Sequence, residues 1–239
     1  MCEVVCNIPH SNTTIPDWAM KDIIISQEEL CELVDFMTDK NVDKIWDFVP
    51  NENKEVATMS RLILDIERFR NDKDEPMSLK GMGLYYTHTP DGKQFRVKSK
   101  DTYSRCLSIY DTYHKSLEEK VTNCLEKFGK CIILDCHSFH DDMNYTEFDP
   151  ISFPDVCIGV NGEVSAEAQL IIDTFVTNGY SVKVNEPFSG SLVPLKYLND
   201  SRVVSVMIEL NRRIYDNSSF NKVQNICKEI FEKLNSNVQ

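Results

Sequence analysis

Histidines, carboxylates and an arginine stand at or near the ends of short apolar runs in this sequence. These residues are His10, Asp65, Glu67, Arg68, Asp135, His137 and Glu209. If the apolar runs are neighbouring parallel strands, the side chains converge at one edge of a sheet, where open α/β sheets bind their ligands. Imidazole and carboxylate together suit a divalent metal, and a separate carboxylate could move protons. The pattern therefore favours a metal site with an acid–base group beside it.

Each of these residues also has an ordinary structural interpretation. His10 could begin a turn, Asp65 could cap one, and His137 could be a hydrogen-bonded histidine at a strand end. Glu209 is harder to explain in this way, because a carboxylate inside the apolar run 206–210 must be paired or functional. The joint occurrence of the residues carries the hypothesis more than any single member does.

Other catalytic arrangements lack their motifs. The sequence has no GxSxG, so a serine hydrolase of the usual kind is not supported. It has no GxGxxG after the first apolar run and no GxxxxGK[ST], which leaves dinucleotides and phosphoryl transfer without a binding loop. Cys136 and His137 are not a catalytic pair, because adjacent residues of a strand point to opposite faces.

The elements that must position these residues alternate between apolar runs and helical patterns, which is typical of an α/β domain. Ser26 and Glu29 form a capping box before a helix, and Gly129 ends a long apolar stripe of helical spacing. We expect strands at residues 4–8, 61–65, 131–136, 180–185 and 203–210, and helices from Ser26 and over residues 103–128, 165–178 and 220–234. Residues 70–96 form a long irregular region that could act as a lid.

The composition limits the possible partners. Lys and Arg number 26 against 38 Asp and Glu, so the net charge is −12, which argues against nucleic acid and anionic membranes. Nine cysteines without a CxxC pair indicate buried free thiols in a reducing compartment. No apolar stretch approaches the ~18 residues of a membrane span. We expect one domain over residues 1–239 in a cytoplasmic monomer or weak dimer.

Five spaced motifs resemble those of the N-formylglutamate amidohydrolase family. They are Pro9-His10-Ser11, Asp65-Ile66-Glu67-Arg68-Phe69, Asp135-Cys136-His137-Ser138, Asn185-Glu186-Pro187-Phe188 with Gly190, and Met207-Ile208-Glu209-Leu210-Asn211-Arg212 with Tyr215. The resemblance covers nearly the whole chain in order. That family is distantly similar to zinc carboxypeptidases and aspartoacylases. The resemblance therefore implies an α/β three-layer sandwich with a mixed, mostly parallel central sheet.

The resemblance also implies roles for single residues. His10 and His137 match the two metal-binding histidines, and the implied metal is Zn²⁺, with another divalent metal as an alternative. Glu209 matches the glutamate that acts as general base and then as general acid. Arg68 matches an arginine that binds the substrate carboxylate, and Asp65 matches an aspartate that orients the first histidine.

Two positions depart from the pattern. Thr13 stands where the carboxypeptidases have a glutamate ligand, and Glu67 stands where those relatives have asparagine. The hypothesis is that Glu67, or failing that Asp65, is the third metal ligand. At a strand end the two would share a face, so the sequence does not choose between them.

The implied reaction is hydrolysis of an N-acyl amide, with N-formylglutamate giving formate and glutamate. A small anionic substrate needs local cations in a chain of this charge, and we expect them to be Arg68, Arg96 and then Arg212, with Asn185 as a further substrate-binding residue. One alternative is a related metallo-amidase or carboxypeptidase-like peptidase acting on another N-acyl amino acid or peptide. A second alternative is a non-catalytic binding protein that retains the cleft.

Overall fold

The computed structural model describes residues 4–142, 153–216 and 218–236. It divides into two compact units. Unit 1 comprises Met1–Ile8, Asn41–Glu55 and Leu117–Gln239, and unit 2 comprises Pro9–Lys40 and Val56–Ser116. The expectation of a single amidohydrolase domain over residues 1–239 stays a prediction.

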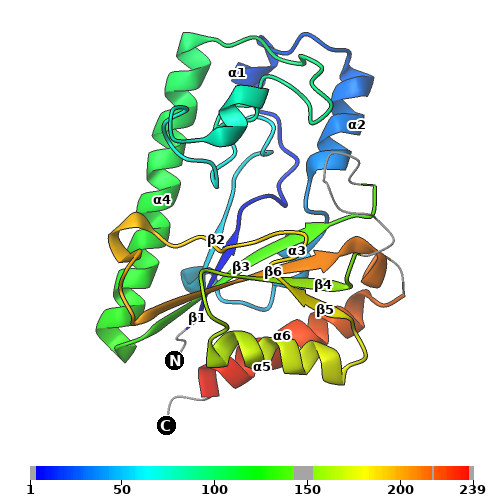
Figure 1. Cartoon of the computed structure of the whole chain (residues 1–239). Coiled ribbons are helices and arrows are strands. Elements are labelled where there is room, and N and C mark those ends of the chain that lie inside the picture. Colours follow the sequence, from blue (N-terminus) through cyan, green and yellow to red (C-terminus); the bar gives the residue numbers. More distant parts are fainter. Residues whose placement is uncertain (1–3, 143–152, 217, 237–239) are drawn as a thin grey trace. The chain divides into compact units, whose positions relative to one another are not determined.

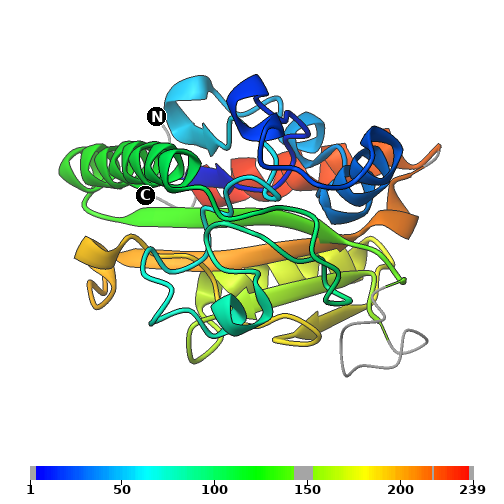
Figure 2. The same cartoon turned by 90° about the horizontal axis from the view of Figure 1, so that it is seen from above.

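A mixed sheet forms the centre of unit 1 (Figure 1). Its strands within the described residues are β1 (Val4–Ile8), β2 (Lys54–Val56), β3 (Cys131–Phe139), β4 (Val156–Val160), β5 (Val182–Val184) and β6 (Val203–Asn211). The order is β2-β1-β3-β6-β4-β5. β3 pairs in parallel with both β1 and β6, which lie on either side of it (β3 and β6 run side by side in Figure 2), and β4 pairs antiparallel with β6. The predicted α/β class with a mixed, mostly parallel sheet is confirmed.

Helices cover both faces of this sheet. α5 (Ala166–Thr177) and α6 (Phe220–Ser236) lie side by side and contact β4, β6 and β1. The part of α4 (Lys100–Phe128) after Leu117 packs on Val5 and Ile133. Cys6 and Cys136 point the other way, toward Cys227 of α6, because adjacent strand residues face opposite sides. The helices and the sheet therefore form three layers, as predicted.

Shorter helical elements complete unit 1. They are α3 (Val42–Ile45), η1 (Asn51–Asn53), η4 (Leu195–Tyr197) and η5 (Arg212–Ile214).

Unit 2 is built from helices and irregular chain. Its elements are α1 (Asp17–Met20), α2 (Gln27–Met37), η2 (Pro76–Lys80) and the first part of α4. α2 begins with the predicted capping box, in which the Ser26 hydroxyl accepts from the Glu29 N–H and the Glu29 carboxylate accepts from the Ser26 N–H. Leu30 and Val34 of α2 pack against residues of the irregular chain, including Tyr86 and Phe95.

The predicted strand at residues 61–65 is wrong. The N–H groups of Ile63 and Leu64 both bond to the Ser60 carbonyl, which makes a turn, and the Asp65 N–H bonds to Leu84. The apolar residues of this run are buried against helices and loops of unit 2. An apolar run indicates that its residues are buried, and buried residues need not form a strand. Asp65 and Glu67 therefore do not follow a strand of the sheet.

Most other predicted elements are present. The long helix ends at Gly129, whose φ of 75° lies in the left-handed region. The helix over residues 165–178 is α5, and the expected strand at residues 180–185 is the shorter β5. β4 was not predicted.

The eight cysteines of the described chain are free thiols, and all except Cys31 are buried. Within the described residues, no helix has the length and apolar character needed to span a membrane.

Candidate functional site

His10 lies in unit 2, two residues after the end of β1, and is 2% exposed. Its Nε2 lies 2.9 Å from Asp65 Oδ1 and 3.8 Å from Glu67 Oε2, while its Nδ1 lies 3.7 Å from Asp39 Oδ2. Burial and the charge of Arg61 lower the pKa of His10, but the carboxylates outweigh them, so its pKa lies above the usual value. The predicted contact between His10 and Asp65 is present.

Asp65 is completely buried and carries a dense set of hydrogen bonds. Its Oδ2 accepts from Arg61 Nη2 at 2.8 Å and from the Tyr86 hydroxyl at 2.6 Å. Its Oδ1 accepts from the backbone N–H of Glu67 at 3.1 Å, besides facing His10. Burial raises the pKa of Asp65, but Arg61 and His10 outweigh this effect and hold the pKa well below its usual value. Asp65 is therefore an ionised carboxylate that orders its neighbours.

Two members of this group were missed in the sequence analysis. Arg61 stands four residues before Asp65, and Tyr86 lies in the irregular region at residues 70–96. The Tyr86 hydroxyl also accepts from Arg68 Nη2 at 3.3 Å, and burial followed by the charge of Asp65 raises the pKa of Tyr86 to about 12. The four-residue spacing of Arg61 and Asp65 could have indicated an ion pair between them, whereas nothing in the sequence pointed to Tyr86.

In unit 1, His137 and Glu209 are direct partners in the register of β3 and β6. Paired residues of adjacent strands point to the same face, and adjacent strands lie ~4.8 Å apart. Cys157 of β4 pairs with Glu209 on its other side. His137 is 3% exposed and Glu209 is 8% exposed. A buried imidazole and a buried carboxylate therefore sit next to each other on the face opposite α6.

Asp135 lies on the same face, two residues before His137. Its carboxylate accepts from Asn7 Nδ2 at 2.7 Å and from the Leu192 N–H at 2.8 Å, and it lies 3.2 Å from His137 Nε2. Burial raises the pKa of Asp135, but His137 and the hydrogen bonds lower it to about 2. Asp135 is thus ionised and buried on the sheet.

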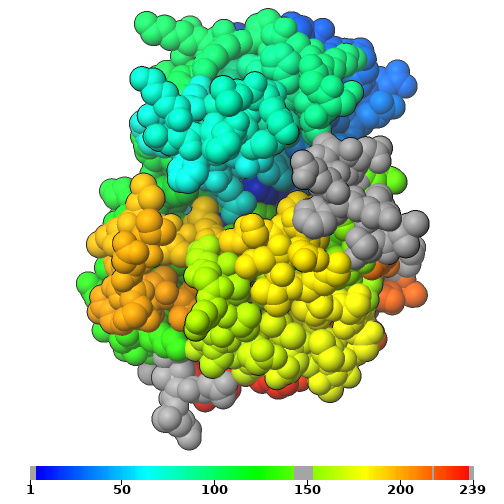
Figure 3. All heavy atoms as spheres, viewed as in Figure 1, coloured from blue at the N-terminus to red at the C-terminus, as the bar shows by residue number. Residues whose placement is uncertain are grey.

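The chain at residues 185–193, which we call the 185–193 segment, crosses this face of the sheet toward α4 (Figure 1, yellow and gold). A Cβ on Gly159 would lie 2.2 Å from the Gly190 carbonyl oxygen, so the segment passes directly over β4. The Cys157 thiol donates to the Phe188 carbonyl. Beyond the segment, Leu195 of η4 and Leu198, which follows it, are exposed. This part of the chain lies at the surface of unit 1 (gold in Figure 3).

Asn185, expected to bind substrate, instead fastens this segment. Its amide oxygen accepts from the backbone N–H groups of Val160 at 2.9 Å and Gly190 at 3.3 Å, and its φ is 56°. Asparagine tolerates this left-handed conformation better than most residues. The side chain therefore holds the end of β4 and the segment together.

Arg96, also expected to bind substrate, lies inside unit 2 and bonds to its backbone. Its guanidinium is completely buried, donates to the carbonyls of Leu62 at 3.3 Å and Ile63 at 2.9 Å, and lies 3.4 Å from the centre of the Tyr85 ring. These contacts stabilise the turn before Asp65 and remove Arg96 from the set of substrate anchors. Arg212, in η5 directly after β6, is 7% exposed.

His10, Glu67 and His137 each carry a donor atom of a kind that binds metal ions. His10 and Glu67 belong to unit 2, and His137 belongs to unit 1.

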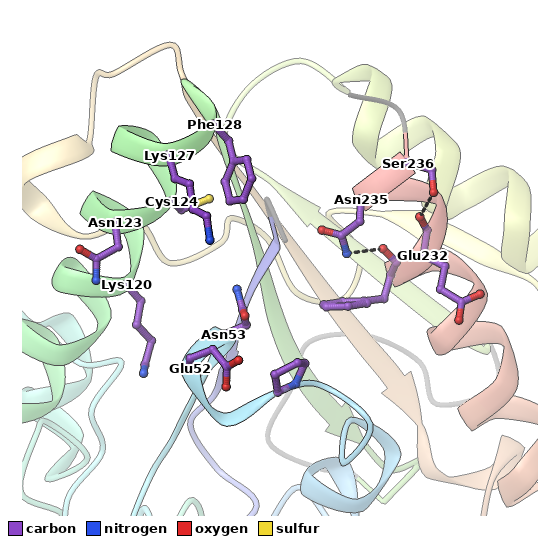
Figure 4. Close-up of a pocket in the computed structure, with 12 residues that line it drawn as sticks. Glu52, Asn53, Lys120, Asn123, Cys124, Lys127, Phe128, Glu232, Asn235 and Ser236 are labelled. Atoms are coloured by element: carbon purple, nitrogen blue, oxygen red, sulfur yellow. Dashed lines mark hydrogen bonds between the residues drawn. The ribbon is translucent and has the colours of Figure 1, made fainter. Parts of the chain in front are cut away.

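A pocket of about 760 Å³ lies elsewhere in unit 1, between α4, α6 and the turn at η1 (Figure 4). Lys120, Lys127, Phe128 and Asn235 are among its lining residues, and none of the predicted site residues is. Its charges are mixed, and Lys120 pairs with Glu55 at 3.6 Å.

Comparisons with known proteins show which family the sequence resembles. Residues 2–216 match the family model for N-formylglutamate amidohydrolase. The chain is 27% identical over 226 residues to an N-formylglutamate deformylase from Pseudomonas putida, covering 89% of this chain and 81% of that protein.

Two solved structures share the fold. The crystal structure of N-formylglutamate amidohydrolase from Ralstonia eutropha JMP134 has a TM-score of 0.83 at 20% identity, covering 99% of this chain and 94% of that one. A gene product from Agrobacterium tumefaciens has a TM-score of 0.71 at 15% identity, covering 99% and 92%. Because the family model spans most of the sequence, including both histidine motifs and Glu209, the chain belongs to the N-formylglutamate amidohydrolase family.

Proposed function

We propose that this protein is a metal-dependent amidohydrolase that cleaves N-formylglutamate to formate and glutamate. The observation that carries the proposal is that each of the two histidines has a buried carboxylate beside one of its ring nitrogens. His10 Nε2 faces Asp65 at 2.9 Å, and His137 Nε2 faces Asp135 at 3.2 Å. Metal-binding histidines typically direct one ring nitrogen to a carboxylate and the other to the metal. The name of the Pseudomonas putida relative supports the choice of substrate.

The proposed metal ligands are His10, Glu67 and His137, and the proposed ion is Zn²⁺. Two imidazoles and one carboxylate are a donor set that suits zinc. A bound ion of this kind supplies Lewis acidity, which polarises an acyl oxygen and lowers the pKa of water.

Glu67 suits the third ligand better than Asp65 does, because both Asp65 oxygens already accept hydrogen bonds from protein donors. Metal analysis of Glu67→Gln and Asp65→Asn separates the two. We expect Glu67→Gln to lose metal. Asp65→Asn should still bind metal, but more weakly, since it keeps all three proposed ligands and disturbs only the contacts that orient His10 and Glu67.

Glu209 is proposed to move the protons of the reaction. It takes a proton from the attacking water and passes it to the leaving amine. Its position beside His137 in the register of the sheet puts the carboxylate next to a proposed ligand, and its low exposure limits competing solvent. A buried carboxylate with an apolar run around it is suited to hold a proton transiently.

Recognition of the substrate carboxylate is proposed for Arg68, followed by Arg212. The Arg68 side chain is 26% exposed and contacts the Tyr86 hydroxyl, so it is ordered and accessible. Against a net charge of −12, such local cations must attract the anionic substrate. Arg68→Lys is expected to raise KM with the metal retained, because lysine lacks the two-pronged geometry of arginine. Wild-type KM and kcat in this variant would exclude Arg68 as an anchor.

One observation favours a second candidate function within the same chemistry. Glu67 stands where related enzymes are expected to have asparagine, so the site carries an additional carboxylate that could alter the preferred substrate. A related metallo-amidase or peptidase acting on another N-acyl amino acid or peptide is therefore the alternative.

The first experiment is metal analysis of freshly purified protein, followed by assays with N-formyl, N-acetyl and peptide substrates on metal-loaded protein. We expect about one zinc per chain and highest kcat/KM for N-formylglutamate. A preference for another substrate supports the alternative, whereas a metal-free protein without activity indicates a binding protein. Size-exclusion chromatography tests whether the protein is a monomer or weak dimer, as proposed. Microscopy or fractionation of cells tests the proposed cytoplasmic location.

A further inference from the structure

Asp135 joins three parts of unit 1 through a single buried carboxylate. Its Oδ1 accepts from Asn7 Nδ2 on β1 and faces His137 Nε2 on its own strand. Its Oδ2 accepts from the backbone N–H of Leu192, in the 185–193 segment. The side chain is 3% exposed. In the proposed reaction, Asp135 neither binds the metal nor moves a proton.

These contacts fix which nitrogen of His137 carries a proton. The amide NH₂ of Asn7 and the backbone N–H of Leu192 can only donate, so they orient the carboxylate from two sides. An ionised carboxylate only accepts, and therefore His137 Nε2 must be the donor. In a neutral imidazole the other nitrogen, Nδ1, then has the lone pair that a metal requires.

The same carboxylate also fastens the 185–193 segment. Ser205, on the same face of β6, donates to the Leu192 carbonyl at 2.7 Å, so Leu192 is bonded on both its N–H and its C=O. The segment is held further along by Asn185 and Cys157. Asp135 is the point at which the segment and the strand of His137 meet.

We propose that Asp135 is a positioning residue that sets the tautomer and ring orientation of His137 for metal binding and ties the 185–193 segment to the same point of the sheet. The proposal rests on the proposed metal site. It predicts that metal affinity and the order of the segment change together when the carboxylate is removed.

The test compares Asp135→Asn with Cys136→Ala. Asparagine keeps the size of the side chain but removes the charge. Cys136 is the next residue of β3 and faces the opposite side, so its variant controls for general weakening of the strand. Zn²⁺ affinity is measured by competition with a chelator, and exchange of the Leu192 amide by hydrogen–deuterium exchange.

We expect Asp135→Asn to bind Zn²⁺ about 10–100-fold more weakly than wild type and to exchange the Leu192 amide faster. Cys136→Ala should retain both wild-type values even if its Tm falls. Wild-type affinity in Asp135→Asn would overturn the inference. Failure of the wild-type protein to bind Zn²⁺ would instead count against the proposed function.

A measurement on the unaltered protein keeps the inference testable if Asp135→Asn does not fold. Nitrogen-15 NMR of the histidine side chains at neutral pH distinguishes the two tautomers, and comparison with His137→Asn identifies the signal of His137. We expect the proton of His137 on Nε2. A proton on Nδ1 in the metal-free protein would overturn the assignment of Asp135.

Discussion

Replacing Gly159 with alanine is expected to displace the 185–193 segment from the sheet. The added Cβ would lie 2.2 Å from the Gly190 carbonyl oxygen, 2.5 Å from Met207 Cε and 2.9 Å from Met207 Cβ. The methionine end can rotate away, but the carbonyl belongs to the backbone of the segment. Relief of the clash therefore requires the segment to move by about 1 Å, because overpacked sites respond through backbone shifts.

The expected loss of stability follows from this geometry. Overpacking a dense region costs about 1–3 kcal/mol. The shift also strains the hydrogen bond from the Cys157 thiol to Phe188 and the one from Leu192 to Asp135. We expect a total loss near the upper end, about 2–3 kcal/mol, which corresponds to a fall in Tm of about 4–12 °C for a chain of this size.

Activity should fall as well if the segment helps to position His137. A misplacement of about 1 Å can cost up to about 100-fold in rate. The assays are urea unfolding, hydrogen–deuterium exchange over the 185–193 segment, and kcat/KM on metal-loaded protein. We expect faster exchange within the segment and unchanged exchange in α6, which lies on the other side of the sheet.

The double variant with Met207→Ala separates the two obstacles. Alanine at residue 207 removes the Cε contact at 2.5 Å, and leaves the Gly190 carbonyl at 2.2 Å and the Cβ of residue 207 at 2.9 Å in place. Gly159→Ala should therefore remain destabilising in the Met207→Ala background. Complete recovery of stability there would refute the argument, since it would mean that the side chain, and not the segment, opposes the Cβ.

Three further substitutions test the roles of single residues. Glu209→Gln should lower kcat by about 100-fold or more with metal content unchanged, and wild-type kcat would exclude it as the general base. Arg96→Lys should lower Tm without changing KM, because Arg96 holds buried carbonyls, whereas a raised KM at wild-type Tm would restore it as an anchor. Burial raises the pKa of Asp155, but hydrogen bonds from Ser181 and Arg213 lower it below the usual value. The ionised Asp155 carboxylate therefore stabilises the fold above the pKa of the unfolded state, and this stabilisation is lost as the pH falls through the pKa of the folded state. The Tm difference between wild type and Asp155→Asn should therefore be largest near neutral pH and vanish in acid, and a constant difference would contradict the assignment.

Local signals in the sequence predicted much of the fold. The capping box at Ser26, the helix end at Gly129 and the apolar runs of β1, β3 and β6 each depend on residues close together in the chain. Motif residues such as His10, His137 and Glu209 were recognisable for the same reason, because their types and their positions after apolar runs are properties of short segments.

Contacts between distant residues could not be predicted in this way. The run at residues 61–65 has the composition of a strand, but its N–H groups donate to the carbonyls of Ser60 and Leu84, and Arg96 donates to the Ile63 carbonyl, so it forms a turn. Tyr86 gives no sign in the sequence that its hydroxyl reaches Asp65. Arg96 had the character of a substrate anchor, yet it is buried against Tyr85.

The sequence by itself therefore determined which chemical groups the protein carries and which strands of the sheet hold His137 and Glu209. Only the tertiary structure decided which partner each group has, including the hydrogen bonds that Asp135 accepts from Asn7 and Leu192. The physical reason is that strand and helix patterns arise from neighbouring residues. Hydrogen bonds to a buried carboxylate depend instead on where segments more than fifty residues apart are brought together.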